Sequence, residues 1–484
     1  MKIKYLIISI LGIVLFSSCQ GDLDINQKSE VSANSMWKES SDAVSAMYGM
    51  YNKQRSTFSY DYLYWGEFRT GLWGESLCGN QKLNQVSQNQ IPTDNSSANW
   101  ENLYSTINQA NLILKYTPNI SFSKEEDKDK VLANAYYVRA FCYYWIGRIW
   151  GDAPLLLEGF ESSQQENLYP VRVSADAIFE QVGIDIEKAI QLMPISVESR
   201  TTASLGSINM LKADYSLWMY KVRNAGDNYL QAADQANTRV LNMSLYNLEK
   251  NYSLIFRQEL GSEIIFAWSY IQDEYTGGIA ADFLVPSQYI SPEYIENPVK
   301  VGSHQQWEFL TDEYQSFLSE NTDDQRTVET FQSFYDDIKK DNYKWINKFS
   351  GTWINNTRVF DSDMIVYRYA DAILFDAEIK MYEGDNISAV VSLNKIAERA
   401  YGVEHYYEAS LSGDALNEAI ISERMKEFAA EGKLWWDYIR MGVAFEKNKY
   451  LQGRENEENV LLWPVSQTSI NKNPNIIQTP GYDK

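Results

Sequence analysis

The 484-residue chain is poor in the residues that most often carry catalysis or bind metals. It contains two histidines and three cysteines. His304 and His405 stand far apart in the sequence, and neither lies in the spacing of a metal-binding motif. The chain has no G-x-S-x-G motif, no phosphate-binding glycine loop and no dinucleotide-binding glycine pattern. We therefore expect a protein that is not an enzyme and that holds no metal and no cofactor.

Basic residues are also in deficit. The chain has 43 Lys and Arg against 65 Asp and Glu, which gives a net charge of -22 and a pI of about 4.6. A surface this acidic repels nucleic acid and anionic membranes, so we expect no nucleic-acid partner. A neutral ligand is compatible with this charge. The hydrophobic content of 44% is enough for a large core.

The chain begins "MKIKYLIISILGIVLFSSCQGDLD", with two lysines before an apolar run from Tyr5 to Phe16. The run is too short to span a bilayer and has the layout of a secretory signal. Residues 16–19 resemble a bacterial lipobox, although Phe16 replaces the usual Leu and Ser18 the usual Gly or Ala. We predict a lipoprotein signal peptide over residues 1–18 and lipid on Cys19, followed by a polar tether over residues 19–35. The alternative is an ordinary signal peptide with an incidental cysteine.

Two further cysteines remain. Two are too few for a disulfide framework in a chain of this length. Cys142 lies in an aromatic helical segment and is expected to be a buried thiol. A single bond between Cys78 and Cys142 is left open.

Apolar residues recur at helical spacing through most of the chain, which predicts a mostly α-helical protein. One helix is expected over about residues 128–149, with Gly151 ending it, and Ser174 has the chemistry of an N-cap for the next. Segments 213–241 and 370–400 each show an apolar helix, a Gly-Asp-Asn turn and a second helix with inward-facing alanines. They predict irregular helical hairpins of the tetratricopeptide-like kind.

The amino-acid composition changes over about residues 242–361. "EIIFAWSY" over residues 263–270 predicts a buried strand, and the Gly, Pro, Asn and aromatic residues around it predict long irregular loops. Binding residues usually sit on loops that a rigid scaffold displays. We divide the mature chain here, into an N-terminal helical region (36–242) and a C-terminal region with the variable loops (243–484).

The segment "ERMKEFAAEGKLWWDYIRMG", which starts at Glu423, combines charges, one glycine and two adjacent tryptophans. Apolar residues spaced three and four apart through it, together with Gly432, predict one continuous helix whose inner face includes Trp435. At Gly432 the missing side chain would let another backbone come close. The charged residues lie mostly off this face and are expected to be solvated or paired, and the position of Trp436 is left open.

The same segment closely resembles the C-terminal signature of the SusD/RagB family of nutrient-binding lipoproteins from Bacteroidetes. Four further segments resemble the family's motifs and occur in family order: "VRAFCYYWIGRIWGDAPL" from Val138, "VYRYADAILFDAEI" from Val366, "LNKIAERAYG" from Leu393, and "LLWPVSQTSINKNPNIIQTPGY" from Leu461. Trp463 stands where the family usually has a smaller residue. Asp22 and Asp24 resemble the signals that send such lipoproteins to the cell surface.

The resemblance implies a mostly α fold of tetratricopeptide-like hairpins (an α/α superhelix) with long aromatic-rich loops and a few short strands. Family members face outward on the cell outer membrane and are not catalytic. Each caps a SusC-like TonB-dependent transporter, captures oligosaccharides or peptides and releases them into the barrel. We therefore expect the outer membrane, a SusC-like transporter and an oligosaccharide as partners.

The binding loops of the family vary, so the site is argued from chemistry. Sugars present apolar ring faces and many hydroxyls, so their sites combine flat aromatics with polar side chains. Loop segments 60–81, 275–307 and 343–353 fit, with Trp73 as first candidate and Trp307 as second. The remaining candidates are Arg69, Trp65, Tyr64, Asn80, Tyr275, Tyr289, Tyr343 and Trp353. The competing interpretation is that these aromatics pack the loops against the helices.

Three other functions are weighed. A peptide-binding member of the same family would favour a roomy polar cavity over aromatic platforms. A secreted glycoside hydrolase would need two carboxylates at a fixed separation, and no local pattern marks such a pair. A scaffold that only gates the transporter would bind no ligand and would have its loop aromatics packed inward.

Overall fold

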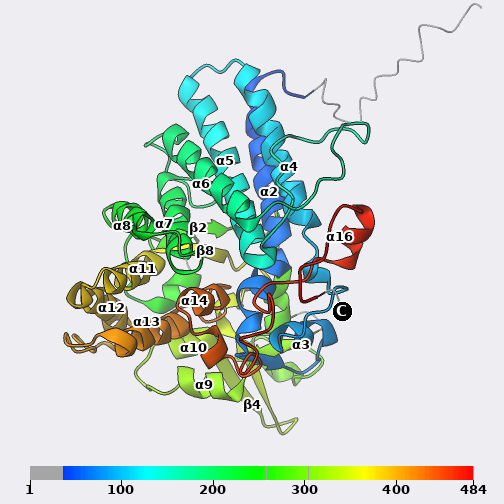
Figure 1. Ribbon diagram of the computed structural model, residues 1–484. Coiled ribbons are helices and arrows are strands. Elements are labelled where there is room, and N and C mark those ends of the chain that lie inside the picture. The colour runs from blue at the N-terminus through cyan, green and yellow to red at the C-terminus, as the bar shows by residue number, and fades with distance from the viewer. Residues whose placement is uncertain (1–35, 258, 303–304, 483–484) are drawn as a thin grey trace, which may run out of the picture.

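The computed structural model describes residues 36–257, 259–302 and 305–482. The expected signal peptide, Cys19, the tether and His304 lie outside the described residues. Within them the protein is mostly helical with a few short strands, as predicted (Figure 1). None of the described helices is long and apolar enough to cross a membrane.

The helices fall into two runs along the chain, one before residue 242 and one after residue 311. The first run is α2 (Ser40–Gly66), α3 (Gln81–Ser87), α4 (Glu101–Tyr116), α5 (Glu125–Trp150), α6 (Ala175–Leu192), α7 (Leu205–Lys221) and α8 (Asp227–Leu241). The second is α9 (Asp312–Leu318), α10 (Arg326–Thr330), α11 (Tyr369–Tyr382), α12 (Asn386–Tyr401), α13 (Gly413–Glu427), α14 (Leu434–Arg440), α15 (Ala444–Lys447) and α16 (Gln467–Lys472).

The described strands form two-stranded antiparallel sheets. They are β1 (Trp73–Glu75) with β3 (Glu308–Leu310), β2 (Ile264–Trp268) with β8 (Met364–Arg368), β4 (Phe331–Asp336) with β5 (Asp341–Ile346), and β6 (Thr352–Ile354) with β7 (Thr357–Val359). Strand β2 confirms the strand predicted from "EIIFAWSY". All five residues of β2 and of β8 are buried, so this pair lies inside the protein.

The predicted helical hairpins are confirmed as α7–α8 and α11–α12. They lie against each other, with α8 beside α11, although more than 100 residues separate them in the sequence (Figure 1). The side-chain amide of Asn237 donates to the carbonyl of Ala372 at 2.9 Å, and the ammonium of Lys380 lies 2.8 Å from Asp234. Small inward-facing residues on these helices allow this close approach.

The predictions for α5 and α6 are also confirmed. Helix α5 is capped at Gly151, which has a φ of 69°, and the side chain of Ser174 accepts a hydrogen bond from the backbone N–H of Ala177. Cys142 is fully buried on α5, and no disulfide joins it to Cys78.

The continuous helix predicted through Gly432 is wrong. Helix α13 ends at Glu427 and α14 begins at Leu434, because the chain turns back between them through positive φ values at Ala430 (65°) and Gly432 (74°). The buried carboxylate of Glu67, on the helix α2 side of the core, accepts the backbone N–H groups of Ala430 and Gly432 at 3.0 and 3.1 Å. A carboxylate from a distant segment therefore replaces the helical hydrogen bonds.

The close approach predicted at Gly432 is confirmed. A Cβ on Gly66 would lie 1.9 Å from the carbonyl oxygen of Gly432, and a Cβ on Gly432 would clash with the ring of Tyr62. Trp435 is completely buried, as expected, and Trp436 is buried as well. The tight turn thus packs the end of α2 against the chain between α13 and α14.

The charged residues of this motif are paired but not solvated. Glu427 and Glu431 are buried, and together with the buried Glu263 they face the cations of Arg368, Arg399 and Lys348. We call these six residues the ion network.

Distances within the ion network are those of charge-assisted hydrogen bonds. The guanidinium of Arg368, at the end of β8, lies 2.7 Å from Glu263 and 2.9 Å from Glu431, and it also contacts Glu427. Lys348 lies 2.7 Å from Glu431. The network joins β8 and the segment before β2 to α12, to the end of α13 and to the turn after it.

Removing one member of the network leaves buried charges unpaired. We expect Arg368→Met to lower the free energy of unfolding by about 3–5 kcal/mol, measured by urea denaturation. The matched control is Lys472→Met, which breaks the exposed pair with Glu101 and should cost no more than about 1 kcal/mol. Equal losses in the two variants would contradict the role given to the network.

The network also predicts a pH dependence. Burial alone would raise the pKa of Glu431, but the charges of Arg368, Lys348 and Lys433 lower it to about 2, from an ordinary value of 4.5. The ionised Glu431 therefore stabilises the fold above pH 4.5, and this contribution is lost as the pH falls towards 2. We expect Glu431→Gln to be less stable than the wild type at pH 7, and the gap in urea midpoint to shrink between pH 5 and pH 3. A gap that does not change with pH would contradict this assignment.

Candidate functional site

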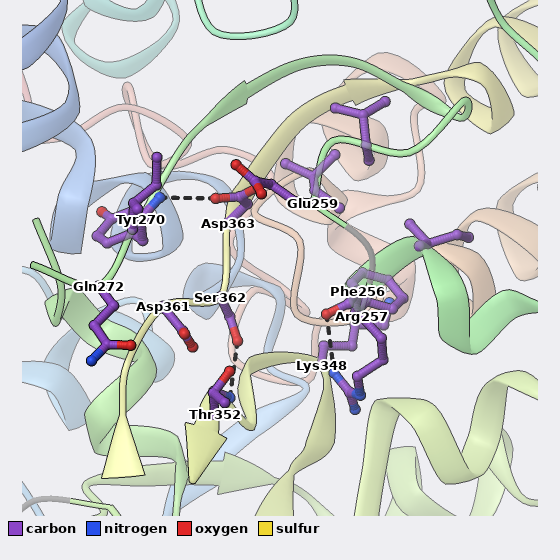
Figure 2. A pocket seen from close by; sticks show the side chains of 15 residues that line it. Phe256, Arg257, Glu259, Tyr270, Gln272, Lys348, Thr352, Asp361, Ser362 and Asp363 are labelled. Carbon is purple, nitrogen blue, oxygen red and sulfur yellow. Dashed lines mark hydrogen bonds between the residues drawn. The ribbon is translucent and has the colours of Figure 1, made fainter. Parts of the chain in front are cut away.

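A cavity of about 320 Å³ opens among the loops of the C-terminal region (Figure 2). Its walls come from segments 255–257, 259–272, 348–352 and 361–365. We call it the loop pocket. Its volume lies at the lower end of the range typical of small-ligand sites.

The buried pair β2–β8 positions two walls of the loop pocket. Ile264 of β2 and Ile365 of β8 line it, and both strands continue into loops at its edge. Asp363 accepts the backbone N–H of Tyr270 at 2.8 Å, which ties the loop after β2 to the loop before β8. The hydroxyl of Ser362 accepts the backbone N–H of Gly351 at 3.0 Å and ties in the third segment. The pocket is therefore held by hydrogen bonds from backbone N–H groups to side chains, one of which joins segments 93 residues apart.

The base of the loop pocket rests on the ion network. Lys348 lines the pocket, yet its side chain is fully buried, and its ammonium donates to Glu431 at 2.7 Å and to the carbonyl of Glu427 at 3.1 Å. Burial lowers the pKa of Lys348 to about 8 from 10.5, against the opposing effect of Glu431. Lys348 therefore connects the loop that lines the pocket to the segment that starts at Glu423.

The side chains that line the pocket are rich in polar groups. Gln272 and Thr352 are exposed, Asp361 and Ser362 are half-buried, and the exposed Arg257 lies on the opposite side in Figure 2. Amide, hydroxyl, carboxylate and guanidinium groups together can donate to and accept from the hydroxyls of a sugar. The chemistry available here is hydrogen bonding of a polar ligand.

Several residues predicted for the site lie in the core instead. Trp73 is 1% exposed and packs edge-to-face on Phe68 at 5.0 Å, and Tyr64 packs on the same ring at 5.3 Å. Trp65 is also 1% exposed, and its indole N–H donates to the carbonyl of Ser97. None of these rings has a face open to a sugar, so we do not carry them into the proposed site.

The predicted polar candidates have structural partners. Arg69 is buried, donates to the carbonyls of Val460 and Leu461 at 2.7 Å each, and stacks over Trp435. It pins the C-terminal segment to the core. Asn80 caps α3 by accepting the backbone N–H groups of the first turn.

The remaining candidates fall into separate packing groups. Tyr289 and Trp353 are half-buried and pack with the buried Tyr343 in a small hydrophobic cluster under the loops. Trp307 packs, half-buried, against the main core. Tyr275 lies under the guanidinium of Arg55, 4.1 Å from its ring centroid. Tyr275 also packs, like Trp307, against the main core. The structure therefore divides these candidates between two hydrophobic clusters and does not assemble them into one surface.

Sequence reasoning missed most residues of the loop pocket. The predicted segment 343–353 contains Lys348, Gly351 and Thr352, but none of these three is among the predicted site residues. The Asp-Ser-Asp triplet at 361–363, just before a buried strand, was a signal that could have been used. Arg257 and Gln272 carry no local signal, because only the folding of β2 against β8 brings them to the pocket.

Among the described residues, no three His, Cys, Asp or Glu side chains are grouped closely enough to hold a metal ion.

Two models of protein families match this chain. The model described as the SusD family matches residues 332–482, and the model described as starch-binding and associating with the outer membrane matches residues 23–208. Together the two matches cover more than half of the chain. The chain belongs to the SusD/RagB family. SusD-like proteins bind carbohydrate and are not known as catalysts, and the family is associated with the outer membrane.

Relatives match along almost the whole chain. SusD-like protein P38 from Formosa agariphila is 25% identical, with 99% of each chain covered, and SusD-like protein P25 from the same organism is 25% identical over 94% of this chain and 93% of its own. Among solved structures, NanU of B. fragilis has a TM-score of 0.82 at 24% identity, covering 95% of this chain and 100% of that one. A SusD superfamily protein from Bacteroides vulgatus has a TM-score of 0.80 at 24% identity, with 92% and 100% covered. These structures confirm the predicted fold class.

The packing role of Trp73 makes a prediction about stability. We expect Trp73→Ala to lower the free energy of unfolding by about 3–5 kcal/mol, as for other buried aromatic truncations. Trp307→Ala is the matched comparison, and because Trp307 is half-buried its loss should be clearly smaller. Urea denaturation of both variants measures this, and a Trp73→Ala variant as stable as the wild type would contradict the burial.

Proposed function

We propose that this protein is a surface-exposed lipoprotein of the outer membrane that binds oligosaccharides in the loop pocket. In this proposal, lipid on Cys19 anchors the chain, and the bound oligosaccharide passes to a SusC-like TonB-dependent transporter. Family membership and the outer-membrane association of the family support the location.

The observation that carries the binding proposal is the polar loop pocket itself. It is a concave site on loops that a rigid helical scaffold displays, and such loops are where binding residues concentrate. Its amide, hydroxyl and carboxylate groups match the hydroxyls of a sugar. A solved structure described as a laminarin-binding SusD-like protein shares the fold, with a TM-score of 0.74 at 19% identity and coverage of 92% and 100%.

One observation favours the scaffold alternative. Trp65, Trp73 and Tyr343 pack inward, which is the arrangement expected if the protein only gates a transporter. The polar pocket supports the binding proposal over the scaffold, because a pure scaffold has no need of a cavity lined by exposed amide and carboxylate side chains. A peptide-binding family member is the other alternative, since the pocket is polar and few of its walls are aromatic.

The test is calorimetric titration of the mature chain carrying Cys19→Ser, which prevents acylation. The ligands are neutral oligosaccharides, amino-sugar oligosaccharides, sialylated glycans and mixed peptides. We expect an oligosaccharide to bind, and Gln272→Ala to weaken that binding about 3- to 10-fold through the loss of one or two hydrogen bonds. Gln164→Ala is the matched control, because Gln164 is an exposed glutamine on a loop outside the pocket, and it should leave the affinity unchanged.

The outcomes separate the alternatives. Binding of peptides alone would overturn the glycan proposal in favour of the peptide-binding function. An oligosaccharide that binds equally to wild type, Gln272→Ala and Thr352→Val would place the site outside the loop pocket. No binding by any ligand class would favour the scaffold.

A further inference from the structure

The loop pocket carries an excess of unpaired negative charge. Three carboxylates line it, those of Glu259, Asp361 and Asp363. Glu259 and Asp363 are drawn in the same part of the pocket in Figure 2, with Asp361 below them. Within the described part of the chain, no Lys or Arg lies within salt-bridge distance of any of the three, and the charge of Arg358 interacts with Asp361 at longer range.

The two cations that line the pocket are neutralised from outside it. Arg257 pairs with Glu329 at 3.1 Å and donates to the carbonyl of Asn347 at 2.9 Å. Lys348 pairs with Glu431 of the ion network. Since neither Glu329 nor Glu431 lines the pocket, these two positive charges are already balanced from outside it. Among the pocket's own carboxylates, Asp361 interacts with the charge of the nearby Arg358, while Glu259 and Asp363 form no salt bridge with a described cation.

The three carboxylates also interact with one another. Burial raises the pKa of the Asp363 carboxyl above its ordinary value, the backbone N–H of Tyr270 opposes this, and the charges of Glu259 and Asp361 add to the rise. Like charges that share a confined space destabilise each other's ionised forms, and a bound cation relieves this repulsion. The electrostatics of the pocket therefore favour a positively charged group.

A metal ion does not fit this arrangement. No described group of three acidic, histidine or cysteine side chains is close enough to coordinate one. A cation that is part of a larger polar molecule can fill a space of about 320 Å³ and reach carboxylates on different walls.

We propose that the loop pocket selects oligosaccharides that carry a protonated amino group, that is, amino sugars that are not N-acetylated. This inference rests on the proposed function and names the ligand class for the same site. The ring hydroxyls bind the polar side chains of the pocket, and the ammonium group lies among Glu259, Asp361 and Asp363. N-acetylation removes the positive charge and adds bulk, so it abolishes the preference.

The experiment compares two ligands that differ only in acetylation. A β-1,4-linked glucosamine tetramer and the corresponding N-acetylglucosamine tetramer are titrated calorimetrically into the mature Cys19→Ser chain at pH 6, where the amines are largely protonated. We expect the glucosamine tetramer to bind about tenfold more tightly or better, and this ratio to fall as NaCl rises from 50 to 500 mM. Cellotetraose is the neutral comparison ligand and sialyllactose the anionic one. Both should bind more weakly than the glucosamine tetramer.

Matched variants locate the effect. Glu259→Gln with Asp361→Asn removes two carboxylates that are not fully buried, and we expect it to bring the ratio of the two affinities close to one. Asp323→Asn with Glu404→Gln makes the same change in net charge at two exposed positions outside the pocket, and it should leave the ratio unchanged. Asp363 is left intact because its hydrogen bond to Tyr270 holds the pocket together. Circular dichroism and urea midpoints check that both double variants fold.

Each outcome bears on a different claim. If the acetylated or neutral tetramer binds as tightly as the glucosamine tetramer, the amino-sugar inference is wrong while the oligosaccharide-binding proposal stands. An equal fall of the ratio in both double variants would assign the preference to overall charge and overturn the inference. Saturable binding of Ca²⁺ alone that is lost in Glu259→Gln with Asp361→Asn would show a metal site and overturn it too. Tight binding of a lysine-containing peptide with no binding of any tetramer would overturn both this inference and the proposed function.

Discussion

The structure depends on a cluster of charges placed in its interior. Arg368 ends the buried strand β8, and its guanidinium reaches Glu263, Glu427 and Glu431. Each of these charges would be very costly to bury alone, so they are tolerable only as a complete set. That requirement joins β2, β8, α12, α13 and the turn after α13 in one arrangement. A buried ion network of this kind specifies which segments meet, whatever its net contribution to stability.

The network explains how the loops of the C-terminal region are held over the helical core. Lys348 belongs to a loop segment, yet its ammonium is satisfied by Glu431 and by the carbonyl of Glu427. The loops therefore do not need a large hydrophobic core of their own, and their own small cluster supports them from the other side. This leaves the side chains above Lys348 free to vary in chemistry while the backbone beneath them stays in place.

Aromatic residues in this protein mainly provide packing. The rings of Tyr64, Phe68 and Trp73 contact each other in the core, and Trp145 and Trp436 meet in the same way. An aromatic-rich loop sequence was a reasonable predictor of sugar platforms, because sugar sites need flat rings. The same rings are also the largest apolar side chains available, and burying them contributes more than exposing them. Composition alone does not distinguish these two uses.

Local sequence patterns determined the helices, their caps, the two hairpins, the buried strand and the family. Examples are the Ser174 cap of α6 and the apolar spacing of α7 and α8. Each of these features depends on residues only a few positions apart, so the sequence is enough to predict it. Tertiary structure alone decided where the motif at Glu423 breaks, because the carboxylate that stabilises the turn comes from Glu67, more than 350 residues away. It also decided which residues line the proposed site. Arg257, Lys348 and Asp361 become neighbours of one cavity only when β2 pairs with β8, and no spacing within the sequence expresses that contact.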